Sequence, residues 1–291
     1  MNKPVIALIG AGRLGSSLAC ALFEKGYPVH GVADSDIALA QETGRALRAK
    51  VAHSDPAMVC PGAEFIIIAV PDAQVRPVAE ALAARQAVKK GQIVCHTSGY
   101  LGSSVLMSVK FLGAYTISMH PLMSFSGRMM PAAGFRGVYF GLEGDAVGLE
   151  PAREMASVLD AFSVVLRSED KPLYHAASVM ASNYVVALLG TAVALLRQNG
   201  VEPGPAQEML LPLVRNTLDN LEKEGLPNAL TGPLERGDCD TVAGHLEALR
   251  NTDPLAWRIY QTLGLAALGM AEQKGLPAAA SAEMRKLLEP D

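Results

Sequence analysis

The stretch that decides the fold of this chain lies near its beginning: Val5-Ile6-Ala7-Leu8-Ile9-Gly10-Ala11-Gly12-Arg13-Leu14-Gly15. Its leading apolar residues predict a buried parallel strand, and residues 16–23 after it have the apolar spacing of a helix. Gly10 permits a tight turn off the strand, Gly12 lets the backbone approach a pyrophosphate, and Gly15 lets the helix pack against the sheet. The free N–H groups at the start of that helix would then face the phosphates.

An acidic residue follows where a dinucleotide-binding unit needs one. Residues 29–33 predict a second strand, and Asp34 stands at its end, about 20 residues after Gly15, where a carboxylate accepts hydrogen bonds from an adenosine ribose. This order of elements predicts binding of NAD or NADP. The expected cofactor contacts here are Gly10, Gly12, Arg13, Leu14, Gly15 and Asp34. The simpler alternative is a glycine-rich turn in an α/β protein that binds no nucleotide.

The same residues slightly favour NAD over NADP. Asp34 would repel the 2′-phosphate of NADP and accept a hydrogen bond from the free 2′-hydroxyl of NAD. The next residue is Ser35, where an NADP enzyme often offers arginine. Arg13 in the glycine loop is a possible opposing cation, although its simplest place is on the pyrophosphate.

Composition and charge restrict the class of protein. The chain has 291 residues, 50% hydrophobic and 19% charged, which suits two domains with buried cores. A net charge of -4 without a basic stripe argues against a nucleic-acid partner. The 4 cysteines lack metal or disulfide spacing, so we expect no metal site and a reducing, cytoplasmic location. No apolar stretch reaches the ~18 residues of a membrane helix, so we expect no membrane partner; the longest, residues 184–196, is expected to be a buried helix.

Apolar strand patterns alternate with helices as far as Arg167 and then give way to helices alone. Further strands are expected at residues 65–70, 92–95, 114–119, 137–142 and 163–166. This alternation predicts an α/β Rossmann domain with a mostly parallel sheet and helices on both faces. The later helices are expected at residues 173–198, 206–224, 240–250, 254–274 and 278–288. We therefore predict a dinucleotide-binding Rossmann domain over residues 1–168 and an all-helical substrate and dimerisation domain over residues 169–291.

Polar residues follow three further strands of the predicted sheet. They are Val70-Pro71-Asp72, His96-Thr97-Ser98-Gly99 and His120-Pro121. Because ligands bind outside the carboxyl ends of parallel strands, we expect Val70-Pro71-Asp72 and Thr97-Ser98 beside the cofactor and His120 beside the substrate. Simpler alternatives are a helix start at Asp72, a turn at Ser98 and structural roles for the histidines.

The first helix of the predicted second domain carries a polar stripe. His175 and Ser182 are seven residues apart and nearly in phase at 100° per residue, and Asn183 lies on the same broad face. Such a stripe suits a catalytic helix facing a cleft, although it would also suit solvent or hydrogen bonds between helices. Farther along, Arg236 is the single cation of a loop between helices and is a candidate for binding a substrate carboxylate, with an ordinary turn as the alternative.

Histidine is the expected proton donor, since its pKa lies closest to neutral pH. His96, His120 and His175 are the candidates. We favour His175, because Asn183 on the same helix could orient a substrate, with Ser182 beside them and His96 as a further catalytic candidate. Lys171 is an alternative acid, but its place beside Pro172 at the helix start predicts that it reaches solvent.

Together these motifs resemble the bacterial Rossmann-like proteins that carry the domain of unknown function DUF2520. The resemblance rests also on Tyr174-His175-Ala176-Ala177 and Thr231-Gly232-Pro233-Leu234-Glu235-Arg236-Gly237-Asp238. It implies an NAD(P) domain followed by a helical domain like the C-terminal domain of 6-phosphogluconate dehydrogenase. More distant similarity extends to β-hydroxyacid dehydrogenases, ketopantoate reductase and pyrroline-5-carboxylate reductase. The hydroxyacid dehydrogenases place a lysine four residues before their asparagine, and here Val179 occupies that position before Asn183.

The function expected from these features is reduction or oxidation of a small polar carbonyl, hydroxy acid or imine with a nicotinamide cofactor. The rival is a regulatory protein that senses NAD(P) without turnover, and a methyltransferase is a more distant alternative. Residues 187–189 and 263–270 are apolar on nearly all sides, and small residues such as Gly264 favour close helix contact. We therefore also expect a homodimer built through the helical domain.

Overall fold

The computed structural model describes residues 3–289 and divides by contacts into two units, Met1–Ser182 and Asn183–Asp291. Each unit is described by itself. Helix α6 (Lys171–Ala181), which the predicted boundary at residues 168/169 assigns to the second domain, groups with the first unit. The reason is local, since Lys171 and Tyr174 on this helix hydrogen-bond residues of the sheet.

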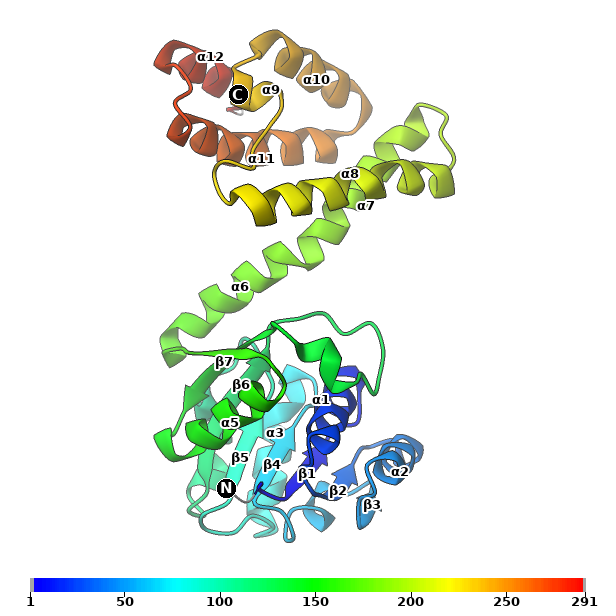
Figure 1. Ribbon diagram of the computed structural model, residues 1–291, viewed down its shortest axis with the longest axis vertical. Coiled ribbons are helices and arrows are strands. Elements are labelled where there is room, and N and C mark those ends of the chain that lie inside the picture. The colour runs from blue at the N-terminus through cyan, green and yellow to red at the C-terminus, as the bar shows by residue number, and fades with distance from the viewer. Residues whose placement is uncertain (1–2, 290–291) are drawn as a thin grey trace. The chain divides into compact units, whose positions relative to one another are not determined.

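The first unit is built on one eight-stranded sheet with the order β3-β2-β1-β4-β5-β6-β7-β8 (Figure 1). Its strands are β1 Ile6–Ile9, β2 Val29–Ala33, β3 Val51–His53, β4 Phe65–Ile68, β5 Ile93–His96, β6 Tyr115–Pro121, β7 Tyr139–Gly144 and β8 Phe162–Val165. Every neighbouring pair is parallel except β6 and β7. The mostly parallel sheet predicted from the sequence is confirmed; the short edge strand β3 was not predicted.

Helices cover both faces of this sheet, as predicted. They are α1 Arg13–Glu24, α2 Ile37–Ala46, α3 Asp72–Ala84, α4 Met107–Lys110 and α5 Ala146–Val158. Alternate residues of a strand point to opposite faces, and the two faces have separate cores. Ile6 and Leu8 of β1 belong to the core that includes α1 and α5, whereas Ala7 and Ile9 belong to the core that includes α3 and α4.

The carboxyl ends of four neighbouring strands meet at one edge of the sheet. Ile9 pairs with Ile68, Ile68 with His96, and His96 with Ser118. These residues form a single row across β1, β4, β5 and β6. The polar groups that follow the row therefore lie along the same edge, as the sequence predicts. One detail differs, since β6 continues through His120 and Pro121 instead of ending before them.

The second unit is entirely helical in its described residues, up to Glu289. Its helices are α7 Asn183–Gln198, α8 Pro203–Glu224, α9 Pro233–Arg236, α10 Cys239–Thr252, α11 Pro254–Gln273 and α12 Ala278–Leu288. A small core joins α10, α11 and α12. Gly264 matters there, because a Cβ at this position would lie 2.6 Å from Cδ2 of Leu288.

The segment around α6 and α7 corrects two expectations. The predicted single helix over residues 173–198 is interrupted at Ser182, whose φ of -126° and ψ of -74° are not helical. Residues 184–196 do not form a buried helix, since α7 contains no buried residue. The helical stretch Ser168–Gln198 is long and apolar enough to cross a membrane by length and composition, with a mean hydropathy of 1.9 in its most apolar window. The expectation that no segment reaches that length was therefore wrong.

Candidate functional site

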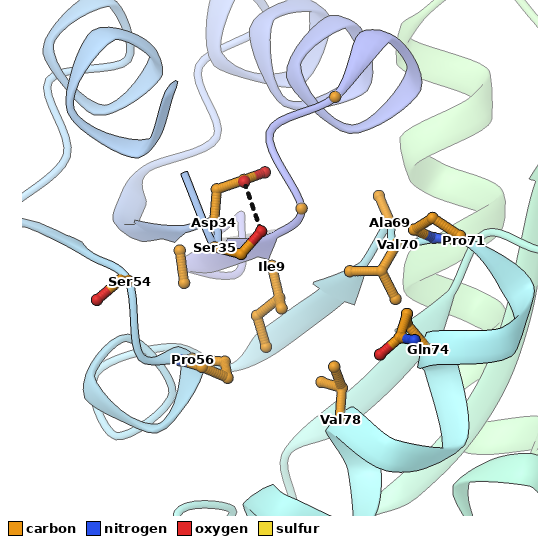
Figure 2. A pocket seen from close by; sticks show the side chains of 13 residues that line it. Ile9, Asp34, Ser35, Ser54, Pro56, Ala69, Val70, Pro71, Gln74 and Val78 are labelled. Atoms are coloured by element: carbon orange, nitrogen blue, oxygen red, sulfur yellow. Dashed lines mark hydrogen bonds between the residues drawn. The ribbon is translucent and has the colours of Figure 1, made fainter. Parts of the chain in front are cut away.

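A pocket of about 320 Å³ lies at the carboxyl ends of β1, β2 and β4. Figure 2 shows Asp34 and Ser35 on one side of it and Val70 and Pro71 on the other, with Ile9 between them. The other lining residues are Gly10, Gly12, Ala33, Ser54, Pro56, Ala69, Gln74 and Val78. This volume is in the range of small-molecule sites, and the place is the switch point at which doubly wound sheets bind dinucleotides.

The glycines of the loop between β1 and α1 have different roles. Gly10 has a φ of 97°, and a Cβ there would lie 2.4 Å from the carbonyl oxygen of Ala69. A Cβ on Gly15 would lie 2.1 Å from the carbonyl oxygen of Gly10. Gly12 has a φ of -63°, which suits any residue, and no heavy atom lies within 4 Å of its Cβ position. Gly10 and Gly15 are therefore required by the fold, whereas the space beside Gly12 is open to a ligand at the α1 N-terminus.

Asp34 holds the glycine loop. Its Oδ2 accepts a 2.7 Å hydrogen bond from the backbone N–H of Ala11, and its Oδ1 accepts one of 2.9 Å from the N–H of Asp36. A carboxylate oxygen has more than one acceptor site. Asp34 therefore combines a structural contact to the loop with a position in the wall of the pocket.

Sequence reasoning missed the connection between β6 and β7, which crosses the glycine loop and α1. Nε of Arg128 donates to the carbonyl oxygen of Ala11 at 3.2 Å, and its Nη2 donates to Thr43 Oγ1 at 2.8 Å. The backbone N–H groups of Met129 and Met130 donate to the hydroxyls of Ser16 and Ser17. Ala11 is thus held by Asp34 at its N–H and by Arg128 at its carbonyl. The sequence around Arg128 contains no local pattern that predicts contacts to residues so distant in the chain.

The predicted cofactor contacts divide into two groups. Those that line the pocket are Gly10, Gly12, Asp34, Val70 and Pro71. Those outside its lining are Arg13, Leu14, Gly15, Asp72, Thr97 and Ser98. The first three begin α1, Asp72 begins α3, and the last two are buried after β5.

His96 is fully buried, and both of its ring nitrogens have backbone partners. The N–H of Ser98 donates to Nδ1 at 3.2 Å, so the proton of the neutral ring is on Nε2, which lies 3.2 Å from the carbonyl oxygen of Gly102. Burial and the nearby charge of Lys171 lower the pKa of His96 to about 4. This environment holds a neutral imidazole that shapes the loop after β5 and has no ring nitrogen left for a substrate.

His120 is hydrogen-bonded to a tyrosine. Its Nδ1 lies 3.0 Å from the hydroxyl of Tyr174. Burial raises the pKa of Tyr174 to about 12, so the phenol keeps a proton that it can donate to Nδ1. Burial and Lys171 lower the pKa of His120 to about 4, so the ring is neutral, and with Tyr174 as the donor its own proton is on Nε2. A Cβ added at Gly141 would lie 2.7 Å from the Tyr174 hydroxyl, so glycine at this position makes room for the phenol.

His175 lies beside His120 at the end of β5. Their ring centroids are 6.2 Å apart and nearly perpendicular, and the ring of Tyr100 is 6.3 Å from that of His175. A Cβ added at Gly99 would lie 2.8 Å from Cδ2 of His175 and 2.9 Å from Cε1 of His120. Gly99 therefore permits the two imidazoles to approach the turn after β5 together. Both rings are half-buried.

Lys171 corrects an expectation. The sequence predicts that it reaches solvent, yet the side chain is 0% exposed. Its Nζ donates to the carbonyl oxygen of Ser98 at 3.0 Å and to the hydroxyl of Ser118. Because α6 begins directly over the ends of β5 and β6, the side chain at its first position points into the sheet edge instead of outward. Burial lowers the pKa of Lys171 to about 8.

The other predicted site residues lie at the end of the first unit or within the second unit. The hydroxyl of Ser182 donates to the carbonyl oxygen of Ser178 at 2.7 Å, a bond within its own helical segment. Asn183 begins α7, and Arg236 ends α9 as an exposed side chain of the second unit. Among the described residues, no group of three or more histidine, cysteine or acidic side chains is placed to hold a metal ion.

Comparisons with known families agree with this architecture. A Rossmann-like domain model matches residues 2–121, and a domain of unknown function (DUF2520) matches residues 138–267. The chain pairs a Rossmann-like domain with a DUF2520 domain. The DUF2520 match begins at β7, so it includes β8, α6 and the residues Tyr174 and His175 as well as most of the helical unit.

Solved structures share the fold over nearly the whole chain. Protein TM1727 from Thermotoga maritima is 25% identical with a TM-score of 0.75, covering 93% of this chain and 99% of that one. BF3122 from Bacteroides fragilis, named provisionally as an NADP oxidoreductase, is 23% identical with a TM-score of 0.72, covering 92% and 98%. A pyrroline-5-carboxylate reductase from Coxiella burnetii is 16% identical with a TM-score of 0.60, covering 99% and 100%. The comparison with curated proteins finds no match. The chain thus shares its fold, at low identity, with solved structures that are named as an oxidoreductase and a reductase.

Proposed function

We propose that this protein is an NAD(P)H-dependent reductase of a small polar substrate. One observation carries the proposal: the pocket beside Gly12 and the His120–His175 pair lie at the same edge of one sheet, within one unit. The row Ile9, Ile68, His96 and Ser118 connects the two places across four neighbouring strands. A dinucleotide bound over the switch point would extend along this edge.

The residues present fit a dinucleotide. The open space at Gly12 and the N-terminus of α1 would receive the pyrophosphate, and Asp34 would bind the adenosine ribose. Val70 and Pro71 would border the path toward β5. The bound cofactor would supply hydride chemistry, and the protein would orient the reactants and manage one proton.

The histidine pair supplies two distinct functions. His120, neutral and protonated on Nε2, is a hydrogen-bond donor that would hold the reacting polar atom of the substrate. His175 would deliver the proton to that atom and take one up again from solvent. Tyr174 acts on His120 by fixing its tautomer, and Gly99 leaves room for both rings.

Turnover of reduced cofactor tests the proposal. The absorbance of NADH and NADPH at saturating protein is followed with a panel of small carbonyl compounds and imines. Oxidation of the cofactor that depends on both protein and panel member supports a reductase. Tight cofactor binding without oxidation by any member would favour the rival function, sensing of NAD(P) without catalysis.

We expect NADH to bind more tightly than NADPH. None of the 13 residues that line the pocket is lysine or arginine, and Asp34 stands where the 2′-phosphate of NADPH would arrive. The name of the B. fragilis relative, in contrast, includes NADP. Titration of both reduced cofactors by fluorescence measures the two Kd values, and Asp34→Ala should weaken the discrimination. Clearly tighter binding of NADPH to the wild-type protein would refute this preference.

We also propose that the protein is a homodimer joined through its helical unit. The contacting helices α7 and α8 expose large apolar side chains: Val186 is 73% exposed, Leu213 61% and Met209 60%. Apolar surface of this extent on a soluble chain marks an interface. A second copy of the chain is the commonest partner of such a surface. We therefore propose that a second copy covers it, and not a membrane or a nucleic acid. We also propose a cytoplasmic location.

Light scattering tests the dimer. The expected mass is twice the chain mass of 30.6 kDa at micromolar concentration. The double variant Val186→Lys/Leu213→Lys should shift the protein toward the monomer, whereas lysine at the already exposed polar residue Gln198 should not. A monomeric wild-type protein, or one that floats with lipid vesicles, would contradict the proposal.

A further inference from the structure

The histidine pair lies in a positive electrostatic environment. Lys171 is fully buried and donates to uncharged oxygens of Ser98 and Ser118 instead of a carboxylate. None of the ion pairs formed within residues 3–289 includes Lys171. The charge of Lys171 lowers the pKa of His120 and of His96, and no carboxylate acts on either ring in the opposite direction.

The carboxylates near Lys171 do not cancel its charge at the pair. Glu143 and Asp72 act to raise the pKa of Lys171, but burial outweighs them and lowers it to about 8, so the ammonium is still charged at pH 7. The two oxygens of Glu143 accept hydrogen bonds from the N–H and the hydroxyl of Ser103, at 2.6 and 2.8 Å. The titratable groups around Lys171 and the pair are Asp72, Cys95, His96, Glu143 and Tyr174.

A fixed positive charge distinguishes the two reactions open to such a reductase. Reduction of a carbonyl group develops negative charge on its oxygen, which a nearby cation stabilises. Reduction of an imine uses the protonated form, whose positive charge the same cation repels. We infer that this site takes an aldehyde or ketone carbonyl as its reacting group, and that it excludes protonated imines. The inference rests on the proposed reductase function and narrows its substrate class.

The step balances with the groups named. The bound cofactor would supply the hydride for the new C–H bond at the carbonyl carbon, and the π pair of the C=O bond would move onto oxygen. Nε2–H of His120 donates a hydrogen bond to that oxygen, and His175 passes to it a proton taken from solvent. The products are an alcohol and the oxidised cofactor, with His175 returned to its starting state.

The test compares the binding of matched products in the presence of oxidised cofactor. Calorimetry measures Kd for pairs that differ in one group, a hydroxy acid against the ammonium acid of the same skeleton, beginning with lactate and alanine and extending to larger pairs. We expect the hydroxy member to bind about tenfold or more tightly at pH 7, the order of effect of one nearby charge. Equal affinity for the hydroxy acids and the ammonium acids overturns the inference, and so does tighter binding of the ammonium acids. Failure of every member of the panel to bind also overturns it.

Lys171→Met should reduce the preference by about tenfold, because it removes the charge while keeping an unbranched apolar chain. A merely structural role for Lys171 would lower both affinities equally and leave their ratio unchanged. If the variant does not fold, the wild-type protein at pH 9 gives the same comparison, since Lys171 loses its proton above its pKa of about 8. An unchanged ratio at pH 9 counts against the inference.

Failure of the carbonyl inference can be distinguished from failure of the proposed reductase function. Binding of NADH and NADPH is measured separately on the same preparation. Cofactor binding with reduction of cyclic imines in preference to oxo acids would overturn the carbonyl assignment and leave the reductase in place. Absence of cofactor binding would overturn both.

Discussion

Replacing Gly12 by valine is expected to weaken the binding of NADH and NADPH strongly while the protein stays folded. No heavy atom lies within 4 Å of the Cβ position of Gly12, and its φ of -63° suits a branched residue. The new methyl groups would occupy the space where a pyrophosphate approaches the start of α1. We expect the Kd of both cofactors to rise by about 100-fold or more, which corresponds to roughly 3 kcal/mol. Fluorescence titration measures the change.

The matched control for this variant is Gly244→Val. Gly244 is exposed on α10 in the second unit, and no heavy atom lies within 4 Å of its Cβ position either. It should leave cofactor affinity unchanged. Thermal unfolding of both variants should stay near that of the wild-type protein, apart from a small loss for a poorer helix cap at residue 12. Unaltered cofactor binding by Gly12→Val would place the cofactor elsewhere.

His175→Ala is expected to lower turnover by roughly 10²–10⁴-fold, the usual contribution of general acid–base catalysis. The affinity for reduced cofactor should hardly change, because His175 does not line the pocket at Gly12. Steady-state rates with a substrate from the carbonyl panel measure the loss, and the titration used for Gly12→Val measures the affinity.

His245→Ala is the control for this second variant, since His245 pairs with Tyr260 in the second unit in the way that His120 pairs with Tyr174. It should retain full turnover. Normal turnover by His175→Ala would move the proton transfer to His120, the remaining half-buried imidazole at the sheet edge. His96 is a poorer replacement, because both of its ring nitrogens already have backbone partners.

The parts of the fold that were predictable are those with local causes. The strand and helix on either side of Gly10–Gly15 follow from apolar periodicity and from the backbone freedom of glycine. His96 and His120 could be placed at one edge because each follows an apolar run, and parallel strands end on the same side. The helices of the second unit could be recognised from spacing and from the glycines and prolines between them.

What could not be predicted depends on contacts between distant residues. Lys171 looks like a solvated side chain at a helix start, and its burial is decided by Ser98 and Ser118 on two strands far from it in sequence. Arg128 reaches Ala11 from a connection without regular structure. The exposure of α7 is a further case, because an apolar helix has the same pattern whether its own chain or a second molecule covers it.

Transfer of deuterium from cofactor to product tests the central claim most directly. The protein is mixed with NADH or NADPH that carries deuterium at both C4 positions of the nicotinamide and with each member of the carbonyl panel, and the products are analysed by mass spectrometry. We expect an alcohol carrying one deuterium at the former carbonyl carbon, formed by the wild-type protein and lost in Gly12→Val. Bound cofactor that keeps its label with every carbonyl compound and every imine would contradict a reductase.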